Sequence, residues 1–181
     1  MSEVKNLVEV KNLKEYFNIN VGMFRSKPLK AVDDVSFAIR KGETLGLVGE
    51  SGCGKTTVGR TLLHLYKPTA GEIWFDGKQI VSKQDILEYR KKTAMVFQDP
   101  YSSLNPAFTI RRIVEEPLRI FGKYSPQERK QRVEEMLDAV GLGPEFYDRK
   151  PHQLSGGQRQ RVSIAAAMIS KPKLHISRKT G

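Results

Sequence analysis

Residues 49–56, GESGCGKT, combine small residues, a lysine and a hydroxyl in the pattern GxxxxGK[ST]. They lie between an apolar run at 44–49 and an expected helix at 55–66. Glycines let the backbone wrap closely around an anion, and the N–H groups at the start of a helix point toward it. Lys55 adds a positive charge for the β- and γ-phosphates, and Thr56 adds a hydroxyl for Mg²⁺. The segment therefore predicts a nucleotide site, against the alternative of a glycine-rich turn that only caps a helix.

A second segment, LSGGQRQR at 154–161, places Ser155, Gly156 and Gly157 before another expected helix at 157–170. Taken alone, this segment is an ordinary helix cap with exposed amides and a small hydroxyl. Two helix N-termini that could each bind an anion do not easily contact one nucleotide in one small domain. We therefore expect the second segment to serve a nucleotide held by another protomer.

Alternating strands and helices are expected to position both segments in an α/β domain. The expected strands are 7–17, 31–39, 44–49, 73–77 and 94–98, with a further one at KLHIS (173–177), and the expected helices are 55–66, 84–92, 109–121, 126–140 and 157–170. Residues 18–28 are expected to form a loop, and 44–49 a strand buried in a parallel sheet.

The helix at 126–140 carries the clearest signals. Ser125 and Glu128 predict a capping box, and Gly141 follows the last turn. Its apolar residues recur at i, i+3, i+4 and i+7, which predicts one buried stripe formed by Val133, Met136, Leu137 and Val140.

Length and composition describe one ordinary globular domain of 181 residues, with 39% hydrophobic and 28% charged residues. The net charge of +11 comes from scattered basic groups, which favours solvated faces over a nucleic-acid binding stripe. We expect no nucleic-acid partner. The single cysteine, Cys53, excludes an internal disulfide and fits a reducing compartment. The N-terminus has no long apolar segment, so we expect no signal peptide.

Four elements in the same order make the chain closely resemble the nucleotide-binding subunit of an ATP-binding cassette (ABC) transporter. GESGCGKTT resembles the Walker A motif and LSGGQ the signature motif. Gln98 in VFQDP resembles the glutamine of the Q-loop, which contacts Mg²⁺ and the attacking water. Phe17 stands where the family places an aromatic residue that stacks on adenine, with the adjacent Tyr16 as an alternative and core packing as the plainer one.

The segments LKAVDDVSFAIRKGETLGLVGESGCGKTT and FQDPYSSLNP are similar to the dipeptide/oligopeptide importer branch, particularly its second ATPase subunit. Nickel and glutathione importers have similar sequences. The resemblance implies a P-loop NTPase-type ABC ATPase core, with a parallel sheet plus an antiparallel β part, a helical subdomain and an incomplete C-terminus. It implies a core lobe at 1–99, a helical subdomain at 100–155, and a signature helix with the start of the Walker B strand at 156–181.

The resemblance also implies cofactors, partners and site residues. The cofactors would be ATP and Mg²⁺. The partners would be permease subunits and a second, different ATPase subunit, at the cytoplasmic face of a prokaryotic plasma (inner) membrane. The expected nucleotide-binding residues are Phe17, Gly49, Glu50, Ser51, Gly52, Cys53, Gly54, Lys55, Thr56, Thr57, Ser155, Gly156, Gly157 and Gln158, the metal-binding ones are Thr56 and Gln98, and Gln98 is the expected catalytic residue. Because the Cys53 thiol lies in the loop, we expect a thiol reagent to block nucleotide binding and ATP to protect against it.

The last residues, HISRKTG, depart from the family pattern. Arg178 stands where the Mg²⁺-associated aspartate belongs, and Lys179 where the catalytic glutamate belongs. A group that orients the attacking water is needed for hydrolysis of a γ-phosphate, so we expect poor hydrolysis from this chain. We expect a truncated or frame-shifted copy of a complete subunit, with the switch histidine beyond Gly181. The alternatives are a nucleotide-binding module that does not hydrolyse ATP, and an ABC-type ATPase acting on nucleic acid.

Overall fold

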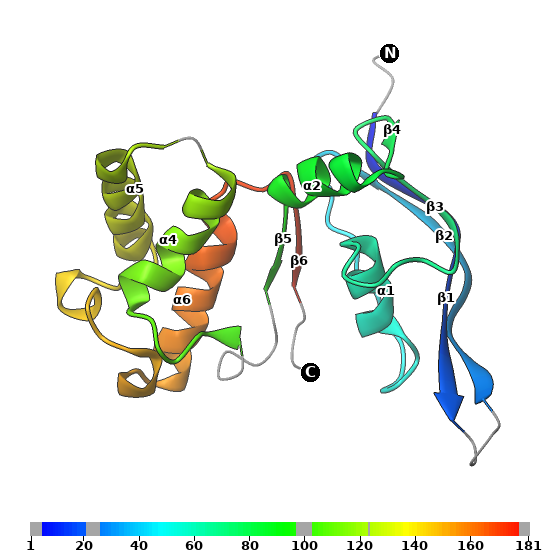
Figure 1. Cartoon of the computed structure of the whole chain (residues 1–181), viewed down its shortest axis with the longest axis horizontal. Coiled ribbons are helices and arrows are strands. Elements are labelled where there is room, and N and C mark those ends of the chain that lie inside the picture. Colours follow the sequence, from blue (N-terminus) through cyan, green and yellow to red (C-terminus); the bar gives the residue numbers. More distant parts are fainter. Residues whose placement is uncertain (1–4, 21–25, 97–102, 123, 178–181) are drawn as a thin grey trace. The chain divides into compact units, whose positions relative to one another are not determined.

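The computed structural model describes residues 5–20, 26–96, 103–122 and 124–177. The chain divides into two compact units, Met1–Tyr89 and Arg90–Gly181. Figure 1 shows the course of the chain through both. Each unit is described by itself.

The first unit is built on a four-stranded antiparallel sheet with the strand order β2-β1-β3-β4. Its strands are β1 (Asn6–Asn20), β2 (Ser26–Arg40), β3 (Ala70–Phe75) and β4 (Lys78–Gln79), and its helices are α1 (Lys55–Leu62) and α2 (Lys83–Lys91), whose last two residues belong to the second unit. Val8, Val10 and Ile73 are almost fully buried in the sheet's core. Tyr89 on α2 packs edge-on against Phe75, with their ring centroids 4.9 Å apart.

Three sequence-based expectations for this unit are wrong, two of them in part. In the loop expected at 18–28, the described residues 18–20 and 26–28 are strand, because β1 runs to Asn20 and pairs with β2 from Ser26 onward. The helix expected at 55–66 ends at Leu62, and His64 then takes a left-handed backbone with φ 53°.

The third expectation, a buried strand at 44–49, fails more fully. Residues 43–50 have no regular secondary structure, and Val48 is 96% exposed. An apolar run becomes a buried strand only when neighbouring strands pair with it and helices cover it. Neither of the two sheets formed by the described residues includes this segment.

The second unit combines a helical bundle with a two-stranded parallel sheet. Its strands β5 (Thr93–Val96) and β6 (Leu174–Ser177) pair with Thr93 opposite Leu174. The helices are α4 (Ile110–Phe121), α5 (Pro126–Ala139) and α6 (Gly156–Met168), with short 3₁₀ turns at Pro144–Phe146 and Pro151–Gln153. The strand expected at 173–177 and the expected helices of this unit are therefore present, apart from shifted ends. The strand expected at 94–98 is present through Val96, and positions 97 and 98 lie outside the described residues.

The capping box and apolar stripe expected for the 126–140 helix are confirmed. Ser125 and Glu128 exchange both capping hydrogen bonds. Val133 and Leu137 are fully buried in the core of this unit, while Met136 and Val140 pack against it. Gly141 has φ +72°, a left-handed conformation that suits glycine after a helix.

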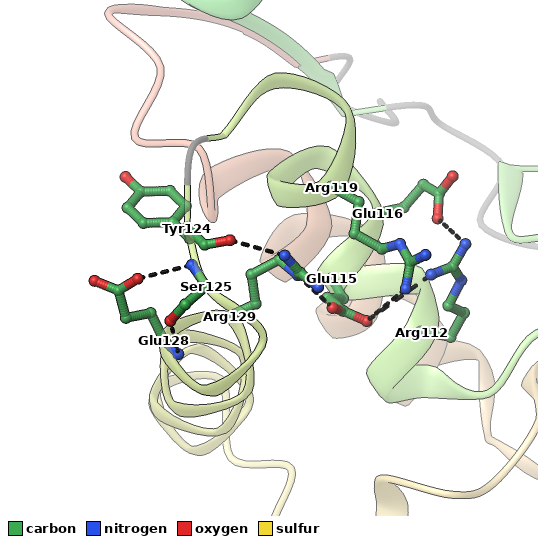
Figure 2. Close-up of polar contacts among 8 residues, drawn as sticks. All are labelled: Arg112, Glu115, Glu116, Arg119, Tyr124, Ser125, Glu128 and Arg129. Atoms are coloured by element: carbon green, nitrogen blue, oxygen red, sulfur yellow. Dashed lines mark hydrogen bonds and ion pairs between the residues drawn. The ribbon is translucent and has the colours of Figure 1, made fainter.

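A half-buried carboxylate ties α4 to α5. Glu115 Oε1 lies 2.7 Å from Nε of Arg129, whose NH1 group also donates to the Tyr124 carbonyl. Arg112 and Arg119 of α4 approach the other oxygen of Glu115 at 4.0 and 3.9 Å. Figure 2 shows these groups converging at the start of α5. Packing and charge together therefore fix this pair of helices.

Candidate functional site

The loop that precedes α1 has the geometry of an anion-binding turn. Gly54 is the N-cap of α1 and has φ +94°, which glycine adopts without strain. A Cβ atom at Gly54 would lie 2.3 Å from the carbonyl oxygen of Ala31, so the backbone passes too closely there for any side chain. Gly52 also has a positive φ, +84°, but open space surrounds it. Glycine is therefore needed at position 54 for both space and backbone conformation, and at position 52 for backbone conformation alone.

Lys55 curls across this loop. Its Nζ atom donates to the carbonyl oxygens of Gly49 and Glu50, both at 2.6 Å, and lies 3.4 Å from the Cys53 sulfur. The ammonium group is thus held over the loop backbone, where an incoming phosphate would meet it. Cys53 is a free, exposed thiol.

The remaining loop residues lie around this centre. Glu50, Ser51 and Gly52 are exposed, whereas Thr56 and Thr57 are half-buried in the first turn of α1. The amides of that turn and the ammonium group can bind a phosphate, because both present positive charge to the same loop. Thr56, the expected metal-binding residue, is the second residue of α1.

The two aromatic candidates on β1 have different surroundings. Phe17 is half-buried and packs edge-on against Tyr66, with a centroid distance of 5.3 Å. The hydroxyl of Tyr16 donates to Asp33, which also accepts a hydrogen bond from Lys30 at 3.1 Å. The hydrogen bond to Asp33 is the main cause that raises the pKa of Tyr16. Tyr16 is thus engaged within the hairpin, and Phe17 is the better candidate for a base platform.

A buried carboxylate near this region was not expected from the sequence. Glu15 is only 4% exposed, and its Oε2 accepts a hydrogen bond of 3.5 Å from Thr61 on α1. Burial raises the pKa of Glu15. Glu15 follows the buried Leu13 by two residues on a strand, so both side chains lie on the same face, and this spacing is the sequence signal for the burial of Glu15. This pair joins the strand that carries Phe17 to the helix that begins at Lys55.

The second glycine-rich segment begins α6 in the second unit. The Ser155 hydroxyl oxygen accepts from the Gln158 N–H at 3.3 Å, and Gln158 Oε1 accepts from the Ser155 N–H at 2.9 Å. The segment therefore caps α6, and the capping box leaves the hydroxyl proton of Ser155 able to donate to an anion. Gly156 and Gly157 are exposed, and open space surrounds Gly157.

Other expected site residues lie outside the described residues, namely Gln98, Arg178 and Lys179. Among the described residues there is no group of three His, Cys, Asp or Glu side chains that could hold a metal ion. No helix in the described part of the chain is long and apolar enough to cross a membrane.

A groove with a volume of about 410 Å³ opens within the second unit, in the size range of ligand sites. It is lined by residues of β5, α4, α6 and the segment before α4: Met95, Ser103, Leu104, Asn105, Phe108, Ile113, Glu116, Pro117, Ser163, Ala166 and Ala167. Its lining is mostly apolar, which favours a peptide or a helix face over a free anion.

The ABC transporter family matches residues 32–177, which include both glycine-rich segments. The chain therefore belongs to this family, as the Walker A and signature resemblances predicted. Its fold agrees with this assignment. It superimposes with a TM-score of 0.81 and 32% identity on an ATP-binding cassette solved as a dimer in a post-hydrolysis state with ADP and Pi, covering 94% of this chain and 72% of that one.

Two curated relatives are ATP-binding proteins of peptide transport. The chain is 50% identical over 178 residues to the oligopeptide transport ATP-binding protein AppF of Bacillus subtilis, covering 96% of this chain and 54% of AppF. It is 44% identical over 182 residues to the dipeptide transport ATP-binding protein DppF of Haemophilus influenzae, covering 97% of this chain and 56% of DppF. The chain thus spans about half the length of the curated relatives it matches.

Proposed function

We propose that this chain is the ATP-binding, energy-coupling part of an importer for dipeptides or oligopeptides. The observation that carries the proposal is the loop at 49–56, where Lys55 Nζ is held over the backbone and Gly54 opens α1 in a left-handed conformation. The names of the relatives AppF and DppF support peptides as the transported class.

The nucleotide would lie with its triphosphate in this loop and its adenine against Phe17. The Thr56 hydroxyl would give one oxygen to Mg²⁺, and Gln98 would be the Q-loop residue that contacts the metal and the attacking water. Bound Mg²⁺ would neutralise charge on the β- and γ-phosphates. Ser155, Gly156, Gly157 and Gln158 would contact the nucleotide of a partner ATPase subunit, because their amides and hydroxyl proton can donate to an anion.

The partners of this chain would be permease subunits and a second, different ATPase subunit, at the cytoplasmic face of a prokaryotic plasma membrane. The groove of the second unit would receive a cytoplasmic helix of a permease, since its lining is mostly apolar and is formed in part by residues 103–117 of the expected helical subdomain. The dimer seen for the related cassette with ADP and Pi supports pairing of two such subunits.

Hydrolysis by this chain is proposed to be slow. Positions 178 and 179 carry Arg and Lys, where the family resemblance implies an aspartate and a glutamate. The two cations would repel Mg²⁺, and no carboxylate at these positions would orient the attacking water. The loss of a general base typically costs about 10²–10⁴-fold in rate.

The single thiol in the loop gives a direct test of nucleotide binding. We expect iodoacetamide to modify Cys53 readily. Saturating ATP with Mg²⁺ should slow that modification at least several-fold, because the nucleotide and the Cys53 thiol would lie in the same loop. Equal rates with and without ATP would contradict the proposed site.

Phosphate release in the same samples separates the leading proposal from a module that only binds nucleotide. Binding with slow release that disappears in Lys55→Ala would support a weakened ATPase. Binding with no release above that variant would favour the binding module.

A further inference from the structure

The chain turns back on itself directly after α1. His64 takes a left-handed backbone with φ 53°, and its N–H donates to the Thr61 carbonyl at 2.9 Å. The next N–H, of Leu65, donates to the Arg60 carbonyl at 2.9 Å. These two hydrogen bonds form a Schellman motif, which ends the helix and redirects the chain. Tyr66 therefore follows α1 close to its last turn, where Arg60 lies.

Hydrogen bonds attach both ends of this segment to β1. The N–H of Thr69 donates to the Lys14 carbonyl at 2.9 Å, and its side-chain oxygen accepts from the Tyr16 N–H at 3.0 Å. Lys14 and Tyr16 flank Glu15, the buried carboxylate that accepts a hydrogen bond from Thr61 on α1. The stretch at 61–69 is thus fixed to β1 where it begins and where it ends.

Tyr66 lies within this stretch and contacts Phe17 of β1. The two half-buried rings are nearly perpendicular, at 83°, with centroids 5.3 Å apart, which is the edge-to-face geometry that aromatic pairs favour. The Tyr66 hydroxyl accepts a hydrogen bond of 2.9 Å from NH1 of Arg60, whose guanidinium lies 5.9 Å from the centre of the Tyr66 ring. A perpendicular neighbour covers at most one face of the Phe17 ring. Tyr66 can therefore fix the plane of that ring and leave its other face for a base.

We propose that Tyr66 is a positioning residue for nucleotide binding, which holds the Phe17 ring in the plane that receives the adenine, and that Arg60 holds Tyr66 in turn. The inference rests on the proposed function, because Phe17 is the proposed base platform. Without Tyr66 the Phe17 side chain would have to be ordered at the moment of binding, and this ordering lowers affinity. Tyr66 contributes to binding of the base and not of the phosphates, which lie in the loop before α1.

The test compares two ligands of the 181-residue chain, ATP and inorganic tripolyphosphate, each titrated calorimetrically with Mg²⁺ present. Tripolyphosphate has the phosphates without the adenosine, so the ratio of the two affinities isolates the contribution of the adenosine. The variants are Tyr66→Leu, Tyr66→Phe, Phe17→Ala, and Tyr66→Leu combined with Phe17→Ala. Tyr124→Leu is the matched control, because Tyr124 in the second unit is also half-buried and has an arginine, Arg132, 4.1 Å from its ring centre.

We expect Tyr66→Leu to weaken ATP binding about 2- to 12-fold, the range that corresponds to one edge-to-face aromatic pair, and to leave tripolyphosphate binding unchanged. Unchanged tripolyphosphate binding also shows that the first unit is folded in the variant. Tyr66→Phe keeps the ring and should bind ATP more tightly than Tyr66→Leu. In the Phe17→Ala background, Tyr66→Leu should cause no further loss, because Tyr66 acts through Phe17. Tyr124→Leu should change neither affinity.

Three results would overturn the inference while leaving the proposed function intact, provided that the wild type binds both ligands. They are an unchanged ATP affinity in Tyr66→Leu, an equal loss of affinity for ATP and tripolyphosphate, which indicates a merely structural role, and an equal loss of ATP affinity with and without Phe17. An unchanged ATP affinity in Phe17→Ala would remove the base platform and the inference together. Failure of the wild-type chain to bind either ligand would count against the proposed function itself.

Discussion

Replacing Gly54 with alanine is expected to destabilise the first unit and to abolish nucleotide binding. Alanine at this position would be held at φ +94°, and a left-handed conformation costs an L-residue about 1–2 kcal/mol. Its Cβ would also lie 2.3 Å from the carbonyl oxygen of Ala31, a backbone atom that moves only with β2. Overpacking of this kind costs about 1–3 kcal/mol, so we expect a total of about 2–5 kcal/mol.

Gly52→Ala is the matched control, because Gly52 has φ +84° with open space where a Cβ would be. It should lose only the conformational cost of about 1–2 kcal/mol. The assay is urea unfolding followed by the fluorescence of Trp74, the single tryptophan, which lies on β3 of the first unit. Equal losses of unfolding free energy in the two variants would refute the close approach of Gly54 to Ala31.

Two further predictions concern the base platform and the cap of α5. Phe17→Ala should weaken ATP binding about 5- to 150-fold, the range expected for one aromatic–base stack, while Tyr16→Phe should change it little. Affinity is measured by titration with fluorescent ATP. A loss of affinity in Tyr16→Ala but not in Phe17→Ala would make Tyr16 the base platform instead. The Ser125 N–H lowers the pKa of Glu128, so the stability that this ionised carboxylate contributes is present at neutral pH and is lost as the pH falls through its folded-state pKa. Wild type should therefore exceed Glu128→Gln in urea resistance at pH 7 and lose that advantage in acid, and a constant difference between pH 7 and pH 3 would contradict the ionised cap.

The sequence predicted best where local signals act within one helix. Ser125, Glu128 and Gly141 mark α5 because caps depend on a few neighbouring residues. The prediction of a strand at 44–49 failed because an apolar run does not show which strands would pair with it. The reach of β1 to Asn20 was missed because the polar residues there suggested a loop, while cross-strand pairing from Phe17–Leu29 to Asn20–Ser26 extends the hairpin.

The candidate site was predicted by motif, and its supporting groups were not. Lys55, Gly54 and Ser155 could be named from pattern and spacing. The contact of Gly54 with Ala31 and the Glu15–Thr61 pair join segments that are 23 and 46 residues apart, so no local pattern identifies these contacts.

Calorimetric titration of the chain with ATP and Mg²⁺, compared with Lys55→Ala, tests the central claim most directly. Lys41→Ala is the control for loss of an exposed lysine outside the loop. We predict saturable one-site binding by the wild type and by Lys41→Ala, and affinity at least about tenfold lower for Lys55→Ala, because charge-assisted hydrogen bonds contribute about 1.5–3 kcal/mol. Equal affinities in all three proteins, or no binding by the wild type, would contradict the assignment of residues 49–56 as a nucleotide-binding loop.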